Sequence, residues 1–260
     1  MTKDKKDTYT AALLIIGNEI LSGRTQDTNS NWMAAQFSGI GIQLVEIRVV
    51  PDDETEIIEA IKALRSKVDY LMTTGGIGPT HDDITAGSVA KAFGVELELN
   101  DDALQMMIKH YGDEVEMTPA RQKMAMIPAG AGLIYNPVSG APGFYLENVY
   151  VMAGVPRIMQ AMFDAVKNEL AHGQPLMSRT VTCNLQESQI AEGLSAVQDK
   201  YAEISIGSYP HYRGGALGLS LVLRGTDEGL LDQATQNVVD LIESLGGQTK
   251  AVSVMAGEQH

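Results

Sequence analysis

The spacing of apolar and polar residues predicts alternating strands and helices in the first two-thirds of the chain. Residues 10–17, "TAALLIIG", form a continuous apolar run, which is typical of a strand covered on both faces. Further strands are predicted at 42–50 and 68–74, and helical spacing marks 28–39 and 52–67 between them. This alternation predicts a three-layer, doubly wound α/β fold with a mostly parallel sheet.

Local end signals support the helices that follow. The helix after Thr85 is predicted to stop at Gly94, because glycine favours the left-handed conformation that ends a helix. Asn100 is a candidate N-cap for the next helix. Thr118 followed by Pro119 is a typical helix start, with the cap residue before a proline in the first turn.

The order of elements changes near residue 175. We expect a first domain over residues 8–172, a short linker, and a second domain over residues 176–252. The second segment reads as strand, helix, two strands and helix, which predicts a small α+β domain.

Charge and cysteine content narrow the class of protein. The chain has 33 acidic and 19 basic residues, for a formal net charge of −14, which disfavours nucleic acid as a partner. Cys183 is the sole cysteine, so it forms no internal disulfide, and its alternating flank favours a buried position in a strand. No apolar run is long enough to span a membrane. We therefore expect a cytoplasmic protein without a membrane partner.

The segment 73–85, "TTGGIGPTHDDIT", is the main candidate for chemistry. Parallel α/β sheets bind ligands beyond the carboxyl ends of their strands, where this loop is expected. Gly75, Gly76 and Gly78 allow backbone N–H groups to turn toward an anion, and the following helix adds its positive dipole end. Asp82 and Asp83 would repel a phosphate unless a divalent cation lies between them. The alternative is an ordinary turn in which Asp83 or the following threonine caps the helix.

Three other loops support this site. The first two are predicted to reach the same edge of the sheet, and the third resembles the 73–85 loop in composition. The loop after the first strand begins with Gly17 and carries Glu19. The segment "PDDE" at 51–54 follows the second strand, and one of its aspartates is expected to cap a helix, which leaves the other available. The loop "NPVSGAPG" at 136–143 is rich in glycine and proline and carries Ser139. Together they predict a metal-and-phosphate site.

Five segments, in this order, resemble the N-terminal domain of the competence/damage-inducible protein A (CinA) family, which has the molybdopterin-binding fold of MogA and MoaB. The small second domain, with "IGSYP" at 206–210, resembles the subdomain that follows in CinA. The five segments are "LIIGNEILSGRTQDTN", "VVPDDETEI", "TTGGIGPTHDDIT", "NPVSGAPGF" and "AGVPRIM". We expect no NMN deamidase activity, because the sequence ends before the place of the C-terminal NMN deamidase domain of full-length CinA proteins.

The resemblance implies a metal-dependent pyrophosphatase acting on ADP-ribose or FAD-like nucleotides. By position, it implies catalytic roles for Asp52 and Asp83, and Mg²⁺, Mn²⁺ or Co²⁺ held by Asp52, Asp82 and Asp83. The residues expected to contact the phosphate-bearing ligand lie in four of the five segments quoted above: Gly17, Glu19, Gly75, Gly76, Gly78, Thr85, Ser139, Gly140, Pro142, Gly154 and Pro156.

A second function stays open at this point. The same pocket would suit molybdopterin or another pterin phosphate, bound without hydrolysis. Ile158 stands where CinA proteins usually have a glutamate, which weakens the pyrophosphatase interpretation if that glutamate binds metal or nucleotide. The resemblance also implies a homo-oligomer, either a dimer or a trimer.

Overall fold

The computed structural model describes residues 6, 8–112, 115–213 and 216–255. The chain falls into two compact units. The first contains the residues up to Phe37 together with Ile42–Gly173, and the second contains Ser38–Gly41 and the residues from Gln174 onward. Each unit has a hydrophobic core of its own.

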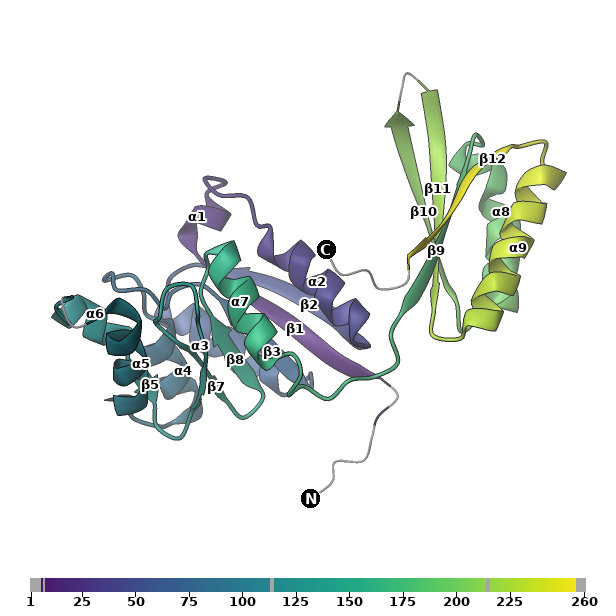
Figure 1. The fold of residues 1–260 in the computed structure, drawn as a ribbon. Helices are drawn as coiled ribbons and strands as arrows, with labels where there is room; N and C mark the ends of the chain where they lie inside the picture. The colour runs from purple at the N-terminus through teal and green to yellow at the C-terminus, as the bar shows by residue number, and fades with distance from the viewer. Residues whose placement is uncertain (1–5, 7, 113–114, 214–215, 256–260) are drawn as a thin grey trace. The chain divides into compact units, whose positions relative to one another are not determined.

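A six-stranded sheet with the order β2-β1-β3-β8-β7-β6 forms the centre of the first unit (Figure 1). Its strands are β1 (Tyr9–Ile16), β2 (Ile42–Val50), β3 (Tyr70–Thr74), β6 (Gly132–Ile134), β7 (Gly143–Leu146) and β8 (Val149–Met152). The neighbours β2, β1, β3 and β8 run parallel, whereas β7 pairs antiparallel with β8 on one side and with β6 on the other. The predicted mostly parallel sheet is confirmed, with an antiparallel pair at one edge.

Helices cover both faces of this sheet. They are α1 (Asn18–Leu21), α2 (Asn29–Gly39), α3 (Glu54–Arg65), α4 (Thr85–Phe93), α5 (Asp101–Tyr111), α6 (Pro119–Lys123) and α7 (Pro156–Val166). Buried residues of α3, α4 and α5 share one core cluster with β1. Figure 1 shows α2 and α7 on the opposite face, where the rings of Phe37 and Phe163 meet edge-on at 5.6 Å. The predicted three layers are therefore confirmed.

The short strands β4 (Leu97–Leu99) and β5 (Met126–Pro128) pair antiparallel in a separate two-stranded sheet. The predicted helix ends are also present. Asn100 accepts a hydrogen bond from the Ala103 amide at 2.9 Å, and Thr118 accepts one from Arg121 at 3.4 Å. Gly94 ends α4 with φ +70°. Local capping chemistry thus set these boundaries.

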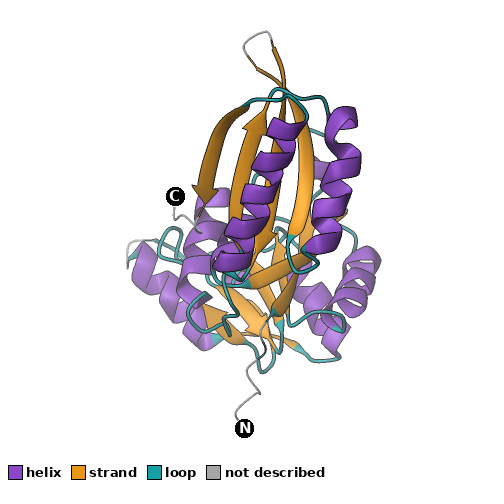
Figure 2. Ribbon diagram, turned by 90° about the vertical axis from the view of Figure 1, so that its right-hand side faces the viewer, coloured by secondary structure: helices purple, strands orange, loops and turns teal. Residues whose placement is uncertain are grey.

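The second unit is a four-stranded antiparallel sheet with the order β10-β11-β9-β12. Its elements are β9 (Met177–Cys183), α8 (Glu187–Lys200), β10 (Ser205–Arg213), β11 (Ala216–Gly225), α9 (Glu228–Ser244) and β12 (Thr249–Met255). Figure 2 shows α8 and α9 together on one face of the sheet. Leu221 and Val181 lie in the core that these helices cover, and the predicted buried Cys183 lies there too.

The last strand, β12, corrects the predicted order of this unit, which ended with a helix. Lys250 to Ser253 are exposed, and half of the Val252 side-chain surface is accessible. The alternation Val252-Ser253-Val254 is too short by itself to distinguish a strand from a loop. The segment becomes a strand because it pairs with β9, and the sequence of the segment does not show that partner.

Candidate functional site

The order of the sheet brings together the loops that follow β1, β2, β3 and β8. The Gly17 amide donates to the Val50 carbonyl at 3.2 Å, and the Gly75 amide donates to the Met152 carbonyl at 3.1 Å. An ideal Cβ on Gly154 would lie 3.3 Å from the Gly75 Cα atom. The predicted meeting of these loops at the carboxyl edge of the sheet is thus present in the structure.

The turn after β3 requires glycine at two successive positions. Gly75 has φ +104° and Gly76 has φ +66°, both in the region that L side chains rarely adopt. A Cβ on Gly75 would lie 2.1 Å from the Ile16 carbonyl oxygen, which is far inside van der Waals contact. The turn therefore passes directly over the end of β1, and no side chain separates the two backbones.

Thr85 fixes the shape of this turn from the start of α4. Its side chain is fully buried, and its hydroxyl donates to the Gly75 carbonyl at 3.0 Å. Its amide donates to the Gly76 carbonyl at 3.0 Å. The threonine that we expected to contact the ligand thus holds the glycine turn.

We expect Thr85→Val to lower the free energy of unfolding by about 1–3 kcal/mol, because it leaves the buried Gly75 carbonyl without that donor. Urea unfolding followed by Trp32 fluorescence measures this, since the single tryptophan lies in the first unit. Ser88→Ala on the same helix is the matched control. The Ser88 hydroxyl shares the Ile84 carbonyl with the Ser88 amide, so its loss leaves that carbonyl bonded. Equal losses from the two variants would contradict the role of Thr85.

The two adjacent aspartates meet at one hydroxyl. Thr80 Oγ1 lies 2.5 Å from Asp82 Oδ1 and 2.5 Å from Asp83 Oδ2, although a hydroxyl carries a single proton. Asp83 Oδ2 also accepts from the Thr80 amide at 2.8 Å. The Thr80 hydroxyl holds the pKa of the Asp82 carboxyl below its usual value. The two carboxyl groups therefore lie side by side around one hydroxyl.

Neither Asp83 nor Thr85 caps the helix with its side chain, so the capping role considered for these two residues is wrong. Ile84 occupies the N-cap position of α4 and makes no side-chain cap hydrogen bond. The first amides of a helix have no acceptor within the helix. The amides of Ala86 and Gly87 occupy these positions and face no capping side chain. The positive end of α4 therefore carries no capping side chain.

The aspartates after β2 divide their roles. Asp53 is the N-cap of α3 and accepts from the amides of Thr55 and Glu56 at 2.9 and 3.1 Å. Asp52 accepts from the Asn18 amide at 2.8 Å and so holds the loop after β1. The open question of which aspartate caps the helix is thereby resolved, and Asp52 is the one that lies beside the predicted site.

The described residues contain no group of three or more His, Cys, Asp or Glu side chains that could hold a metal ion. Of the three carboxylates predicted as ligands, Asp82 and Asp83 lie together, whereas Asp52 is bound to the neighbouring loop. Glu19 folds back toward Gly17, where its carboxylate lies 2.6 Å from the position of an ideal Cβ. A metal here would take two carboxylates and would need further oxygens from the ligand.

The loop at 136–143 is organised by Asn136, which is buried. Its Oδ1 accepts from the Ser139 amide at 3.2 Å, and its Nδ2 donates to the Ser139 hydroxyl at 2.6 Å. Gly140 has φ +78° and packs against His110 of α5. The predicted contacts of Ser139 and Gly140 with a ligand stay predictions, because their observed contacts lie within the protein.

A small hollow of about 80 Å³ lies beside the glycine turn and the first turn of α4. It has room for several water molecules. Four predicted residues, Gly76, Gly78, Asp83 and Pro142, line it together. The other lining residues are Ile77, Ala86, Gly87, Leu97, Lys123, Met124, Met126, Ile127 and Phe144. The structure thus joins the glycine–aspartate loop with the 136–143 loop at one cavity.

The sequence analysis missed Lys123 and Asn29. Lys123 lines the hollow, and its ammonium donates to the Thr80 carbonyl. Asn29, which is 7% exposed, donates from Nδ2 to the Gly154 carbonyl at 2.8 Å, and its Oδ1 has no partner among the described atoms. Its place in the "QDTN" segment was the available signal. Pro156 starts α7 beyond Gly154 and is exposed.

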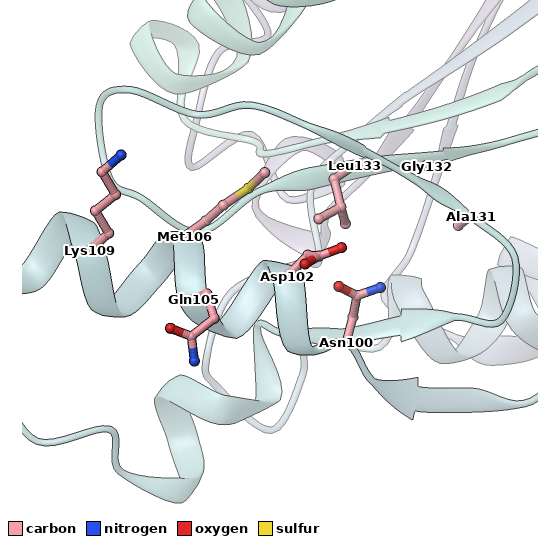
Figure 3. A pocket seen from close by; sticks show the side chains of 8 residues that line it. All are labelled: Asn100, Asp102, Gln105, Met106, Lys109, Ala131, Gly132 and Leu133. Atoms are coloured by element: carbon pink, nitrogen blue, oxygen red, sulfur yellow. The ribbon is translucent and has the colours of Figure 1, made fainter.

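A larger hollow of about 540 Å³ lies elsewhere in the first unit, between α5 and β6 (Figure 3). It is lined by Asn100, Asp102, Gln105, Met106, Lys109, Ala131, Gly132 and Leu133. None of these residues belongs to the predicted site. Figure 3 shows Met106 extending from α5 toward β6 while Gln105 points away. The larger hollow lacks the glycine turn and uncapped helix start, so the smaller one is the stronger phosphate candidate.

The family described as a probable molybdopterin binding domain matches residues 12–172, and the middle domain of FAD synthase matches 175–246. A protein of Pyrobaculum arsenaticum is 35% identical, over 94% of this chain and 98% of its own. One of Saccharolobus islandicus is 32% identical, over 93% and 97%. The crystal structure of the protein CinA of unknown function from Thermoplasma acidophilum is 37% identical with a TM-score of 0.59, over 63% of this chain and 99% of its own. No helix in the described part of the chain is long and apolar enough to cross a membrane.

Proposed function

Since the chain belongs to the family of probable molybdopterin-binding domains and resembles CinA, as its motifs predicted, we propose that its first unit hydrolyses the pyrophosphate bond of a nucleotide. The proposed substrates are ADP-ribose and FAD-like dinucleotides. The observation that carries the proposal is the hollow at the uncapped start of α4, which Gly76, Gly78 and Asp83 line.

Backbone groups support the binding of a phosphate in this hollow. The amides of Ala86 and Gly87 lie in the first turn of α4, at the positive end of the helix dipole. Gly76 and Gly78 let the loop before α4 pack closely, because an ideal Cβ would lie 2.2 Å from Thr85 Oγ1 at Gly76 and 2.7 Å from Asp83 Oδ2 at Gly78. These amides would stabilise negative charge on a phosphate oxygen during hydrolysis.

Asp82 and Asp83 could hold a divalent metal ion whose remaining ligands are phosphate oxygens of the substrate. Asp82 and Asp83 offer two carboxylates around Thr80, and one or two carboxylates are what Mg²⁺ usually takes from a protein when substrate phosphates complete its shell. Oδ1 of Asp83 accepts no hydrogen bond from the described residues, so it is the oxygen of this side chain that is available to bind a metal. A bound cation would place positive charge against the phosphate oxygens.

Matches along the chain support two different ligands. The match of residues 175–246 to the FAD synthase middle domain favours a flavin dinucleotide as substrate. The match of residues 12–172 to a probable molybdopterin-binding domain favours the second candidate, a protein that binds a pterin phosphate without hydrolysing a nucleotide. The two candidates share the phosphate and differ in whether a pyrophosphate bond is broken.

An AMP-release assay tests the proposal. The purified protein is incubated with ADP-ribose or FAD and with Mg²⁺, Mn²⁺ or Co²⁺, and AMP is measured by chromatography. We expect AMP with at least one of the cations and none when EDTA is present. Failure to form AMP with every cation would reject the hydrolase. Pterin fluorescence that co-purifies with such an inactive protein would favour the second candidate.

A further inference from the structure

We propose that Lys123 is a phosphate-binding residue of the small hollow and exchanges the Thr80 carbonyl for a phosphate oxygen when the ligand binds. The inference rests on the proposed function, because it assigns a role within the same site. Nothing in the sequence motifs points to Lys123, which lies in α6, far along the chain from the glycine–aspartate loop.

The position of Lys123 supports this role. Its side chain lines the same cavity as Gly76, Gly78 and Asp83, and it is partly buried. Its ammonium already donates to the carbonyl of Thr80, the residue whose hydroxyl meets both aspartates. The Lys123 ammonium is therefore held at the cavity by the protein itself, and a phosphate in the hollow would lie within its reach.

Charge makes the assignment more specific. Among the described residues that line the hollow, Lys123 is positive, Asp83 is negative and the others are uncharged. No described carboxylate lies within ion-pair distance of the Lys123 ammonium. The hydrogen bond from the Thr80 hydroxyl is the main cause that lowers the pKa of the Asp82 carboxyl, and the charge of Lys123 adds to it. A neutral carbonyl is a weaker partner for an ammonium than a phosphate is. The Lys123 ammonium would therefore leave the Thr80 carbonyl and bind an anion that enters the hollow.

The helix that carries Lys123 is well anchored. Thr118 caps α6, Pro119 occupies its first turn, and Arg121 donates to the Glu116 carbonyl at 2.6 Å. Met124, which follows Lys123, packs against the main core cluster of the first unit. The ammonium therefore reaches the hollow from a fixed backbone, which lowers the entropic cost of binding.

Binding without turnover tests the inference. Titration calorimetry in the presence of Mg²⁺ measures the affinity for inorganic phosphate and for AMP, neither of which contains a pyrophosphate bond to hydrolyse. We expect Lys123→Met to weaken both by about tenfold, because it removes a charge-assisted contact, and Lys123→Arg to retain most of the affinity. Lys109→Met is the matched control, since it removes the same charge from the other hollow and should bind as the wild type does.

A second readout separates phosphate binding from a structural role. The wild-type affinity for inorganic phosphate should fall with added NaCl more steeply than that of Lys123→Met, because salt screens the charge contact. If Lys123→Met does not fold, as judged by Trp32 fluorescence, Lys123→Gln replaces it, and the wild-type salt dependence is measured in either case.

The outcomes distinguish this inference from the proposed hydrolysis. Equal affinities of the wild type and Lys123→Met, or a loss with Lys109→Met alone, would overturn the role of Lys123. A wild type that binds neither probe would overturn it as well. Lysine-dependent binding without any AMP formation would reject the hydrolase and retain the phosphate contact.

Discussion

Gly75→Ala is expected to lower the free energy of unfolding of the first unit by roughly 3–5 kcal/mol. Two costs add at this position. Alanine is strained at φ +104°, and its Cβ would lie 2.1 Å from the Ile16 carbonyl oxygen. That oxygen belongs to the backbone at the end of β1, an interior strand of the sheet, so it cannot turn aside as a flexible side chain can. Either β1 or the glycine turn must shift.

Urea unfolding followed by Trp32 fluorescence measures this loss in the first unit. Gly130→Ala is the matched control, because Gly130 has φ +79° but no atom within 4 Å of an ideal Cβ. It carries the conformational strain alone and should cost about 1–2 kcal/mol. If both variants lose the same amount, the close approach to Ile16 does not contribute and the turn is looser than the structure indicates.

Asp83→Asn is expected to reduce metal-dependent AMP formation at least about 100-fold, with little change in stability. Asparagine keeps an oxygen that can accept from the Thr80 amide, so the loop retains this hydrogen bond. It loses the negative charge that we propose holds the cation. The expected pattern is therefore a loss of activity at every cation concentration tested, with an unfolding midpoint close to that of the wild type.

Asp53→Asn is the control for the charge itself. Asp53 follows a neighbouring strand but caps α3, and asparagine caps helices about as well as aspartate. We expect this variant to retain activity and stability. A comparable loss of AMP formation in both variants would mean that general electrostatics, and not a role of Asp83 in the site, explains the effect. A large loss of stability in Asp83→Asn would assign that residue a structural role.

Much of the candidate site could be predicted because its signals are local. Glycines that adopt positive φ, a proline at the cavity and acids after the ends of parallel strands all lie in short segments of the sequence. The division between Asp52 and Asp53 could not be predicted, because either carboxylate can cap α3. It was decided by the loop after β1, whose Asn18 amide donates to Asp52.

Lys123 shows the limit of local signals more clearly. It lies 43 positions from Thr80, in a short helix that has no chemical motif. The core around Met124 and the Thr118 cap place that helix against the loop. Thr85 is the reverse case: its position in the motif suggested a ligand contact, but the close packing of the turn uses its hydroxyl internally.

The sequence by itself determined the main parallel strands and covering helices of the first unit, several helix ends, and the strand edge at which the candidate site lies, whereas α1 and β5 were not predicted. These features follow from hydrophobic period, capping side chains and backbone preference, which act over a few residues. The tertiary structure alone decided that β12 is a strand, that Asp82 and Asp83 share Thr80, and that Lys123 supplies a cation to the hollow. Each of these depends on contacts or orientations that only the folded chain sets, and the residue types alone do not specify them.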